Sequence, residues 1–296
     1  MRPILTDTSP DGLRAAIDAD IVASRLYNGD VPLEAHEEAD VAWAIATDGR
    51  LVRPVVAWAS FEPASVERRL DELLAVVDER RGRMLWWLAP HHAPSDLTAR
   101  LLRRGFRHVD DTAAMAMDLA RLPDVIEVPA GVRIELVDDA DDVDAYVALL
   151  IREKEAAHPP MAPDAAAVRR RHINGRLGND PDSRRFVARL DGQPVATSRL
   201  SMAGGAAGLY TVVTMPEARG LGIGRAMTLT ALLAGREAGM RIGALQATEM
   251  GRRIYARLGF EELFRYKLLV RPRAAKTPTT GHSARPPASG AALDDQ

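Results

Sequence analysis

Apolar residues along the first 120 positions recur at two alternating spacings. Residues 13–27 and 65–77 place them three or four apart, as one face of an α-helix requires. Elsewhere, runs of β-branched and aromatic residues predict strands at 41–46, 51–60, 84–88 and 109–119. A further helix is expected over 95–104, before Gly105-Phe106. This alternation predicts an α/β unit.

The pattern breaks at 122–131, which contains two prolines and a glycine. We therefore expect a linker at 123–131 between a domain over 1–122 and a second domain over 132–270. From 271 to 296, Pro, Ala, Ser, Thr and Gly dominate without periodicity, and such a segment cannot bury a core. It is predicted to be a disordered tail.

After the linker, the periodicity predicts a strand, two helices, a hairpin, a strand followed by a helix, a strand, a helix and a last strand. The predicted strands are 132–137, 185–190, 194–202, 209–214, 242–248 and 264–270. The predicted helices are 138–151, one ending near 177, 223–233 and 251–258, with a proline-rich loop at 158–163. This order again predicts an α/β fold.

Composition narrows the class of protein. The 296 residues allow roughly two domains of about 150 residues each, and the hydrophobic share of 47% suffices for a buried core. A formal net charge of −2 gives no reason to expect nucleic acid or a membrane as partner. The chain has no cysteine, and no His-Glu-His grouping has metal-ligand spacing, so no metal is expected. Without an apolar run long enough to span a bilayer, we expect a cytoplasmic protein.

One stretch carries recognisable chemistry. Strand-like residues 209–214 lead through a glycine-rich turn into the helix predicted from Ile223. The first amides of a helix have no internal partners and the helix dipole favours an anion, so this turn can cradle a phosphate. Arg219 and Arg225 flank the turn and can add charge-assisted contacts.

The spacing of this turn excludes two common phosphate-binding motifs. A dinucleotide fingerprint needs a third glycine at a position that is Arg225 or Met227 here. A Walker A loop needs a lysine, which the turn lacks. A nucleotide-binding protein of another fold and a plain glycine turn between packed elements remain as alternatives.

The turn resembles the acetyl-coenzyme A motif of the GNAT superfamily of N-acetyltransferases. That motif is Gln/Arg-x-x-Gly-x-Gly/Ala after a strand, and Arg219–Gly224 matches it, preceded by a typical lead-in over 213–218. A second match covers Gln246–Phe260, a strand followed by a helix that bears Tyr255 and ends in Leu-Gly-Phe. The order of elements from 131 to 270 is also that of the family.

The resemblance implies direct transfer of an acetyl group from acetyl-CoA to an amine, with Tyr255 protonating the departing thiolate. It places the pyrophosphate on the turn and the pantetheine arm along the end of the preceding strand. The implied coenzyme contacts are Val212, Val213, Thr214, Arg219, Gly220, Leu221, Gly222, Ile223, Gly224 and Arg225.

The first domain carries a fainter version of the same pattern. Residues 101–106 align with 255–260, but Leu101 takes the place of Tyr255 and no Arg-x-x-Gly-x-Gly precedes the helix at 65. The expected fold is thus a tandem GNAT fold, with two mixed central sheets flanked by helices and a degenerate first copy. The alternative is an unrelated α/β domain that happens to end in Gly-Phe.

The predicted function is N-acetyltransfer to a primary amine of a small molecule or peptide, by a monomer or homodimer. The alternative is a non-catalytic acetyl-CoA-binding sensor or scaffold. The general base is open: Glu217, Glu249, His158 and His172 are candidates, each of which is also typical of an ordinary surface or loop residue.

Overall fold

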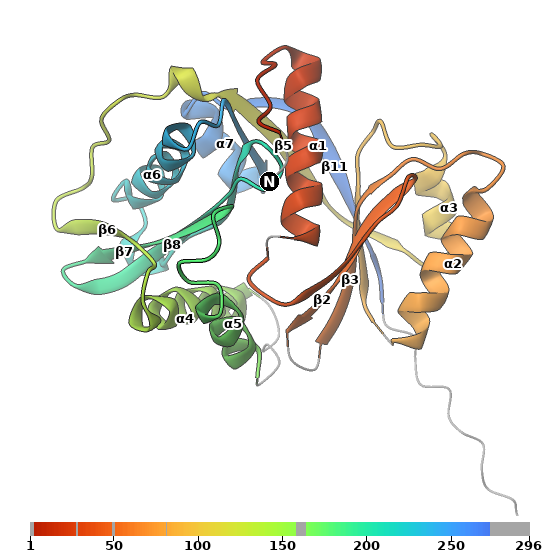
Figure 1. The fold of residues 1–296 in the computed structure, drawn as a ribbon, viewed down its shortest axis with the longest axis horizontal. Coiled ribbons are helices and arrows are strands. Elements are labelled where there is room, and N and C mark those ends of the chain that lie inside the picture. Colours follow the sequence, from red (N-terminus) through yellow and green to blue (C-terminus); the bar gives the residue numbers. More distant parts are fainter. Residues whose placement is uncertain (1–2, 28, 49–50, 81, 158–163, 273–296) are drawn as a thin grey trace, which may run out of the picture.

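The fold is built on one mixed sheet of 11 strands, in the order β1-β2-β3-β4-β11-β5-β10-β9-β8-β7-β6. A computed structural model describes residues 3–27, 29–48, 51–80, 82–157 and 164–272, and helices cover both faces of the sheet (Figure 1). The α/β class and the mixed sheet flanked by helices are confirmed. The predicted loop at 158–163 and nearly all of the predicted tail lie outside the described residues.

The N-terminal half, taken as residues 3–121, contains every element predicted for it and one more strand. Its elements are α1 (Pro10–Leu26), β1 (Leu33–Glu37), β2 (Val41–Asp48), β3 (Leu51–Ala59), α2 (Val66–Glu79), β4 (Met84–Leu88), α3 (Leu97–Arg103), β5 (Arg107–Asp118) and the 3₁₀ turn η1 (Leu119–Arg121). The strand missed from the sequence is β1. It lies at the edge of the sheet and buries no residue, so it has no apolar alternation to detect.

The C-terminal half, taken as residues 132–271, follows the predicted order. Its elements are β6 (Val132–Leu136), α4 (Ala140–Ala157), α5 (Ala165–Asn174), β7 (Ser183–Leu190), β8 (Gln193–Ser201), β9 (Ala207–Thr214), the 3₁₀ turn η2 (Pro216–Ala218), α6 (Ile223–Glu237), β10 (Ile242–Ala247), α7 (Glu249–Arg257) and β11 (Glu261–Arg271). Helix α7 begins where the Thr248 hydroxyl accepts a hydrogen bond from the Gly251 N–H.

The two sheets expected from the sequence are joined into one because the halves exchange strands. Strand β5 pairs antiparallel with β10 of the C-terminal half, and β11 pairs antiparallel with β4 of the N-terminal half. The two exchanged strands also pair with each other along most of their length. Each half therefore completes its sheet with a strand from the other.

The cores on the two faces can be read from neighbouring residues of β5. Met115 packs with α6 in one cluster, whereas Ala116 packs with α1 in another, on the opposite face. Helices α4 and α5 also lie opposite α6, because Val187 packs with them and Ala188 packs with α6. Helix α1 thus lies on the central strands, between the two halves (Figure 1).

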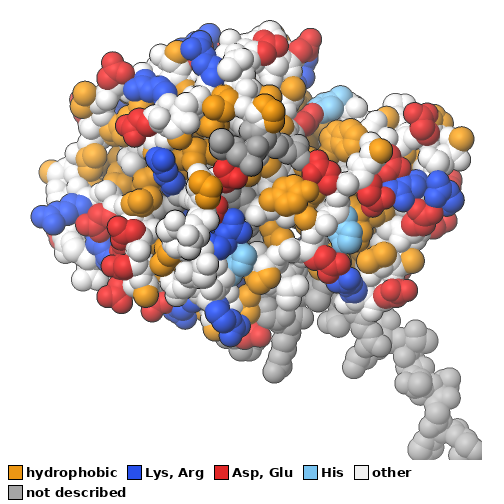
Figure 2. All heavy atoms as spheres, in the orientation of Figure 1, with side chains coloured by type: hydrophobic (Ala, Val, Ile, Leu, Met, Phe, Trp, Pro, Cys, Tyr) orange, Lys and Arg blue, Asp and Glu red, His pale blue; other side chains and the backbone are white. Residues whose placement is uncertain are grey.

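The face of the protein drawn in Figure 2 carries charges of both signs. On the face drawn in Figure 2, Lys and Arg side chains are interspersed with Asp and Glu. Within the described residues, no helix is both long and apolar enough to cross a membrane.

Candidate active site

The centre of the C-terminal half contains an opening between two parallel strands. Strands β9 and β10 pair at three positions, the last of which is Leu209 with Leu245. Beyond that pair, β9 continues to Thr214 while pairing only with β8 on its other side. The backbone edge of residues 210–214 that faces β10 is therefore free of strand pairing. We call this gap the strand opening.

A backbone irregularity lies at the start of the strand opening. Thr211 has a φ of 49°, in the left-handed region that a β-branched residue rarely adopts, and the β8–β9 register shifts next to it. Two hydrogen bonds hold Thr211 there: its carbonyl accepts one from the Thr197 hydroxyl at 2.9 Å, and its hydroxyl lies 2.9 Å from that of Tyr146. Strain maintained by specific contacts is typical of functional positions.

The predicted phosphate-binding turn follows β9 directly. Gly220 and Gly222 both have a φ of 81°, which glycine tolerates and other residues adopt with strain. Helix α6 begins after Gly222, whose carbonyl accepts the first intrahelical bond, from Ala226 N–H. The amides between them point out of the helix end, where an anion can bind. The turn is exposed, apart from the buried Ile223 and the half-buried Gly224.

The arginines at the two ends of this turn differ in their contacts. Arg219 donates from Nε to the carbonyl of Thr214 at 3.1 Å, which holds its guanidinium over the end of β9. Arg225 lies exposed in the first turn of α6. Gly224 lies close to β9 as well, since an added Cβ would be 3.3 Å from the Thr214 hydroxyl. The turn and the end of β9 thus form one continuous surface.

Tyr255 lies on α7, which follows β10. Its half-buried ring contacts Phe260 edge to face at 5.8 Å and packs against the same apolar cluster as Val212. Tyr255 and the end of β9 therefore lie on the α6 side of the sheet. Burial raises the pKa of Tyr255 to about 12, so its phenol is protonated at neutral pH.

Of the four residues considered as general bases, the three that the structure describes are not gathered at the strand opening. Glu217 is exposed and accepts a hydrogen bond from Arg152 at 2.9 Å, and Glu249 is exposed and paired with arginines of α7 and β11. His172 is half-buried on α5, and burial lowers its pKa. His158 lies outside the described residues.

The opposite face of the strand opening carries a buried polar cluster that the sequence analysis did not find. Asp20 of α1 is fully buried and accepts a hydrogen bond from the Tyr210 hydroxyl at 2.6 Å. Burial raises the pKa of Asp20 to about 7, against the hydrogen bond from Tyr210 and the positive charges of Arg199 and Arg25, which lower it. The signal was available, because Asp20 lies three positions after Ile17 on the apolar face of its helix.

A second buried carboxylate lies next to this cluster. Asp30 accepts hydrogen bonds from Arg185 Nε at 2.9 Å and from the Tyr146 hydroxyl at 3.0 Å. Burial favours a high pKa for Asp30, but the charges of Arg199 and Arg185 outweigh it and hold the pKa below its ordinary value. Because Tyr146 also contacts Thr211, the chain just after α1 is linked to the strand opening.

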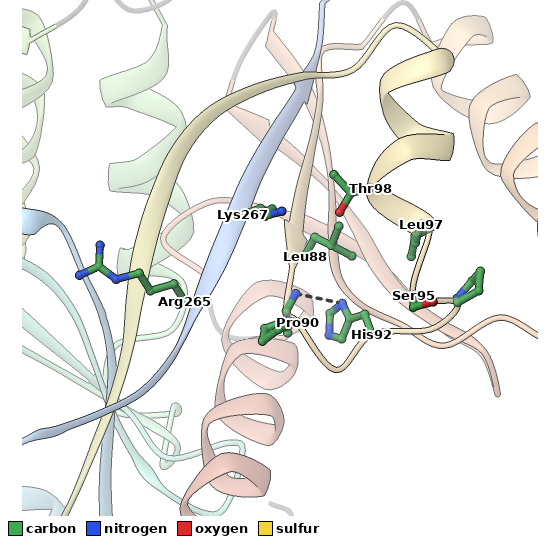
Figure 3. A pocket seen from close by; sticks show the side chains of 10 residues that line it. Leu88, Pro90, His92, Ser95, Leu97, Thr98, Arg265 and Lys267 are labelled. Atoms are coloured by element: carbon green, nitrogen blue, oxygen red, sulfur yellow. Dashed lines mark hydrogen bonds between the residues drawn. The ribbon is translucent and has the colours of Figure 1, made fainter.

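The N-terminal half has a pocket between the end of β4 and the start of α3 (Figure 3). It has a volume of about 230 Å³ and is also lined by residues of β11. His92 lines it and accepts the Ala89 N–H at Nδ1, and Lys267 reaches it from β11. Leu101, aligned with Tyr255, is fully buried and carries no acid.

Comparison with known proteins agrees with this architecture. Residues 181–262 match the acetyltransferase (GNAT) domain family. A mycothiol acetyltransferase of Actinosynnema mirum is 29% identical over 225 residues, which cover 72% of each chain.

Two solved structures share the fold. A GCN5-related N-acetyltransferase from Kribbella flavida has a TM-score of 0.65 and 24% identity, covering 87% of this chain and 95% of that one. A tandem GNAT protein from the clavulanic acid biosynthesis pathway has a TM-score of 0.58 and 17% identity, covering 92% of this chain and 98% of that one. The chain is therefore similar to GNAT acyltransferases in sequence and in fold, and its match to the GNAT domain family covers residues 181–262.

Proposed function

We propose that this chain transfers the acetyl group of acetyl-CoA directly to a primary amine, with the donor held in the strand opening. The observation that carries the proposal is the glycine turn at the start of α6, continuous with an unpaired strand edge at β9. The turn can bind an anion, and the free strand edge beside it can bind an extended chain. Together they match a coenzyme whose pyrophosphate continues into a pantetheine arm.

The donor would bind through backbone groups and two arginines. The pyrophosphate would accept hydrogen bonds from the amides between Gly220 and Arg225, with Arg219 and Arg225 adding charge. The pantetheine arm would pair with Val212, Val213 and Thr214 as an added strand does. Leu221, Gly222, Ile223 and Gly224 complete this proposed contact surface.

In the proposed reaction, the amine nitrogen attacks the thioester carbonyl, the N–C bond forms, and the C–S bond breaks. A backbone N–H at the end of β9 would polarise the carbonyl oxygen. Tyr255 would give its proton to the departing thiolate. Burial that keeps Tyr255 protonated would also raise the proton affinity of a thiolate formed in the same apolar surroundings.

The substitution Tyr255→Phe tests this role. It removes the proton but keeps the ring against Phe260, so kcat should fall by about 10²-fold or more with acetyl-CoA affinity nearly unchanged. The control is Tyr27→Phe, because Tyr27 is exposed and bonded to Glu37, in the N-terminal half. Turnover unaffected by Tyr255→Phe would remove Tyr255 from the mechanism.

The acceptor is proposed to be a small-molecule or peptide amine. The mycothiol acetyltransferase relative supports a small molecule, so mycothiol-related amines belong in a panel with glucosamine, serine, spermidine and a short peptide. Release of coenzyme A with any of these amines would support the enzyme. Tight binding of acetyl-CoA without release on the whole panel would favour the sensor or scaffold instead.

The same proposal includes a division of labour between the halves. The segment 1–122 would be a degenerate copy, joined by a linker at 123–131 to the competent domain at 132–270. This division, the absence of a metal, the cytoplasmic location and the monomeric or dimeric state stay predictions.

A further inference from the structure

Helix α1, from the N-terminal half, is pressed against the strand opening of the C-terminal half. An added Cβ at Gly208 would lie 1.9 Å from Asp20 Oδ1, and one at Gly204 would lie 2.7 Å from the Ala19 carbonyl. These two glycines let the helix approach the backbone around β9. Gly208 is two residues before Tyr210, where the strand opening begins. The Asp20 carboxylate is therefore placed at the closed end of the opening.

The carboxylate is held by side chains from both strands of the opening. Its Oδ2 accepts the Tyr210 hydroxyl of β9 at 2.6 Å. The side-chain amide of Gln246, on β10, lies next to Asp20, and the hydrogen bond between them lowers the pKa of Asp20.

Charged and titratable groups face Asp20 from four elements. They are Arg25 of α1, Arg199 of β8, Tyr210 of β9 and Tyr266 of β11. The Arg199 guanidinium lies 4.8 Å above the centre of the Tyr210 ring, and that of Arg25 lies at 5.8 Å. Burial and the neighbouring Asp20 carboxylate raise the pKa of Tyr210 well above its ordinary value, against the charge of Arg25, which lowers it. The hydroxyl of Tyr210 therefore keeps its proton at rest, and it can pass that proton to Asp20 only as it takes up another.

We propose that Tyr210 removes a proton from the acceptor amine and passes its own hydroxyl proton to Asp20. This inference rests on the proposed function, since it assigns the base of that reaction. As the amine nitrogen bonds to the thioester carbon, one N–H proton moves to Tyr210 Oη and the Tyr210 proton moves to Asp20 Oδ2. The thiolate takes a separate proton from Tyr255. Before the next turnover, Asp20 gives up the proton that it gained, and Tyr255 takes up a proton in place of the one that it lost. Both protons are exchanged with water.

The arrangement separates the acid from the base across the sheet. Tyr255 lies on the α6 side of β9 and β10, whereas Tyr210 and Asp20 lie on the α1 side. A thioester in the strand opening would have one tyrosine on each side. The pKa of Asp20, raised mainly by burial to about 7, suits a group that accepts a proton near neutral pH. The N-terminal half would then contribute a group to the reaction although it lacks a coenzyme turn.

Three variants test the proposal in the full-length chain: Asp20→Asn, Tyr210→Phe and the control Asp18→Asn. Asp18 lies on the same helix and accepts a similar bond, from the Tyr266 hydroxyl at 3.0 Å, while its other oxygen lies 2.7 Å from Nε2 of His91 in the N-terminal half. Coenzyme A release would be followed from about pH 5 to pH 9 with glucosamine and with spermidine, two amines of different basicity. Affinity for acetyl-CoA would be measured separately for each variant.

The expected result is a loss of kcat of about 10²-fold for Asp20→Asn and Tyr210→Phe, with acetyl-CoA affinity unchanged. The rise of the wild-type kcat near neutral pH should occur at the same pH with both amines and vanish in Asp20→Asn. Asp18→Asn should keep wild-type kcat within about twofold. If Asp20→Asn does not fold, Tyr210→Phe carries the test alone.

Two results would overturn the inference in different ways. If the wild-type chain turns over an amine and either Asp20→Asn or Tyr210→Phe keeps the wild-type kcat and pH profile, the inference is overturned. The proposed function then still stands. No coenzyme A release by the wild-type chain on any amine would overturn the proposed function, and the inference with it.

Discussion

The substitution Asp20→Asn should make the protein more stable above neutral pH. In the folded chain, burial raises the pKa of Asp20 to about 7 from the ordinary 3.8. Between these two values the folded state binds more protons than the unfolded state, so the stability of the wild-type protein falls as the pH rises. Below the lower value both states are protonated and no cost arises; above the higher value both are ionised and the full cost is present.

The size of the effect follows from the two pKa values. A tenfold difference in proton affinity corresponds to about 1.4 kcal/mol, so ionising buried Asp20 costs on the order of 4 kcal/mol at pH 8. Asparagine has no carboxyl to ionise, while its side-chain oxygen can still accept the Tyr210 hydroxyl. The free energy of unfolding of Asp20→Asn should therefore exceed that of wild type at pH 8, and the advantage should fade toward about pH 4.

The assay is urea unfolding followed by circular dichroism at several pH values, with the difference between variant and wild type as the measured quantity. Other titrating groups contribute to both proteins and largely cancel. Tyr210→Phe should change the stability in the opposite direction. The Tyr210 hydrogen bond lowers the pKa of Asp20, so without it the ionised carboxylate costs more, and the protein should be destabilised most at high pH. A difference for Asp20→Asn that is constant with pH, or grows toward acid, would refute the reasoning.

Three further outcomes follow from contacts described above. Gly208→Ala should destabilise by about 1–3 kcal/mol in urea unfolding, because its Cβ would collide with the Asp20 carboxylate, and Asp20→Ala should restore most of the loss. Gly222→Ala should weaken acetyl-CoA binding in calorimetry and cost about 1 kcal/mol of stability, because φ is 81° there. Asp30→Ala should cost about 3–5 kcal/mol in unfolding, because it leaves the buried Arg185 with only a 4.0 Å contact to Asp180.

The sequence was sufficient for the order of elements apart from β1, and for the position of the glycine turn before α6, since both depend on local signals. Helical spacing in α1 and the glycines before α6 are visible in consecutive residues. The exchange of β5 and β11 is not visible in the sequence, because strand partners more than a hundred residues apart leave no trace in a local pattern. The expectation of two separate sheets came from that limit.

For the candidate site as well, local motifs predicted some residues, and only the tertiary structure revealed others. Tyr255 and the turn at 219–225 were predicted from motifs and stay predictions, whereas Asp20 was missed because its environment depends on packing against the other half of the chain. From the sequence, an acid on a helix is read as an exposed residue. Its place three residues after Ile17 indicated burial, but only the structure shows that the buried carboxylate lies beside Gly208 and Tyr210, next to a strand opening.

The exchange of β5 and β11 also determines when the sheet can be completed during synthesis of the chain. Strand β11 ends at Arg271, so one edge of β4 and one edge of β5 have no neighbour until that residue has left the ribosome, and the other edge of β5 waits for β10. A nascent N-terminal half would expose these three unpaired strand edges, which are templates for aggregation. Chains interrupted before residue 261 should therefore need a chaperone or be degraded, and neither half should be recoverable as a stable fragment.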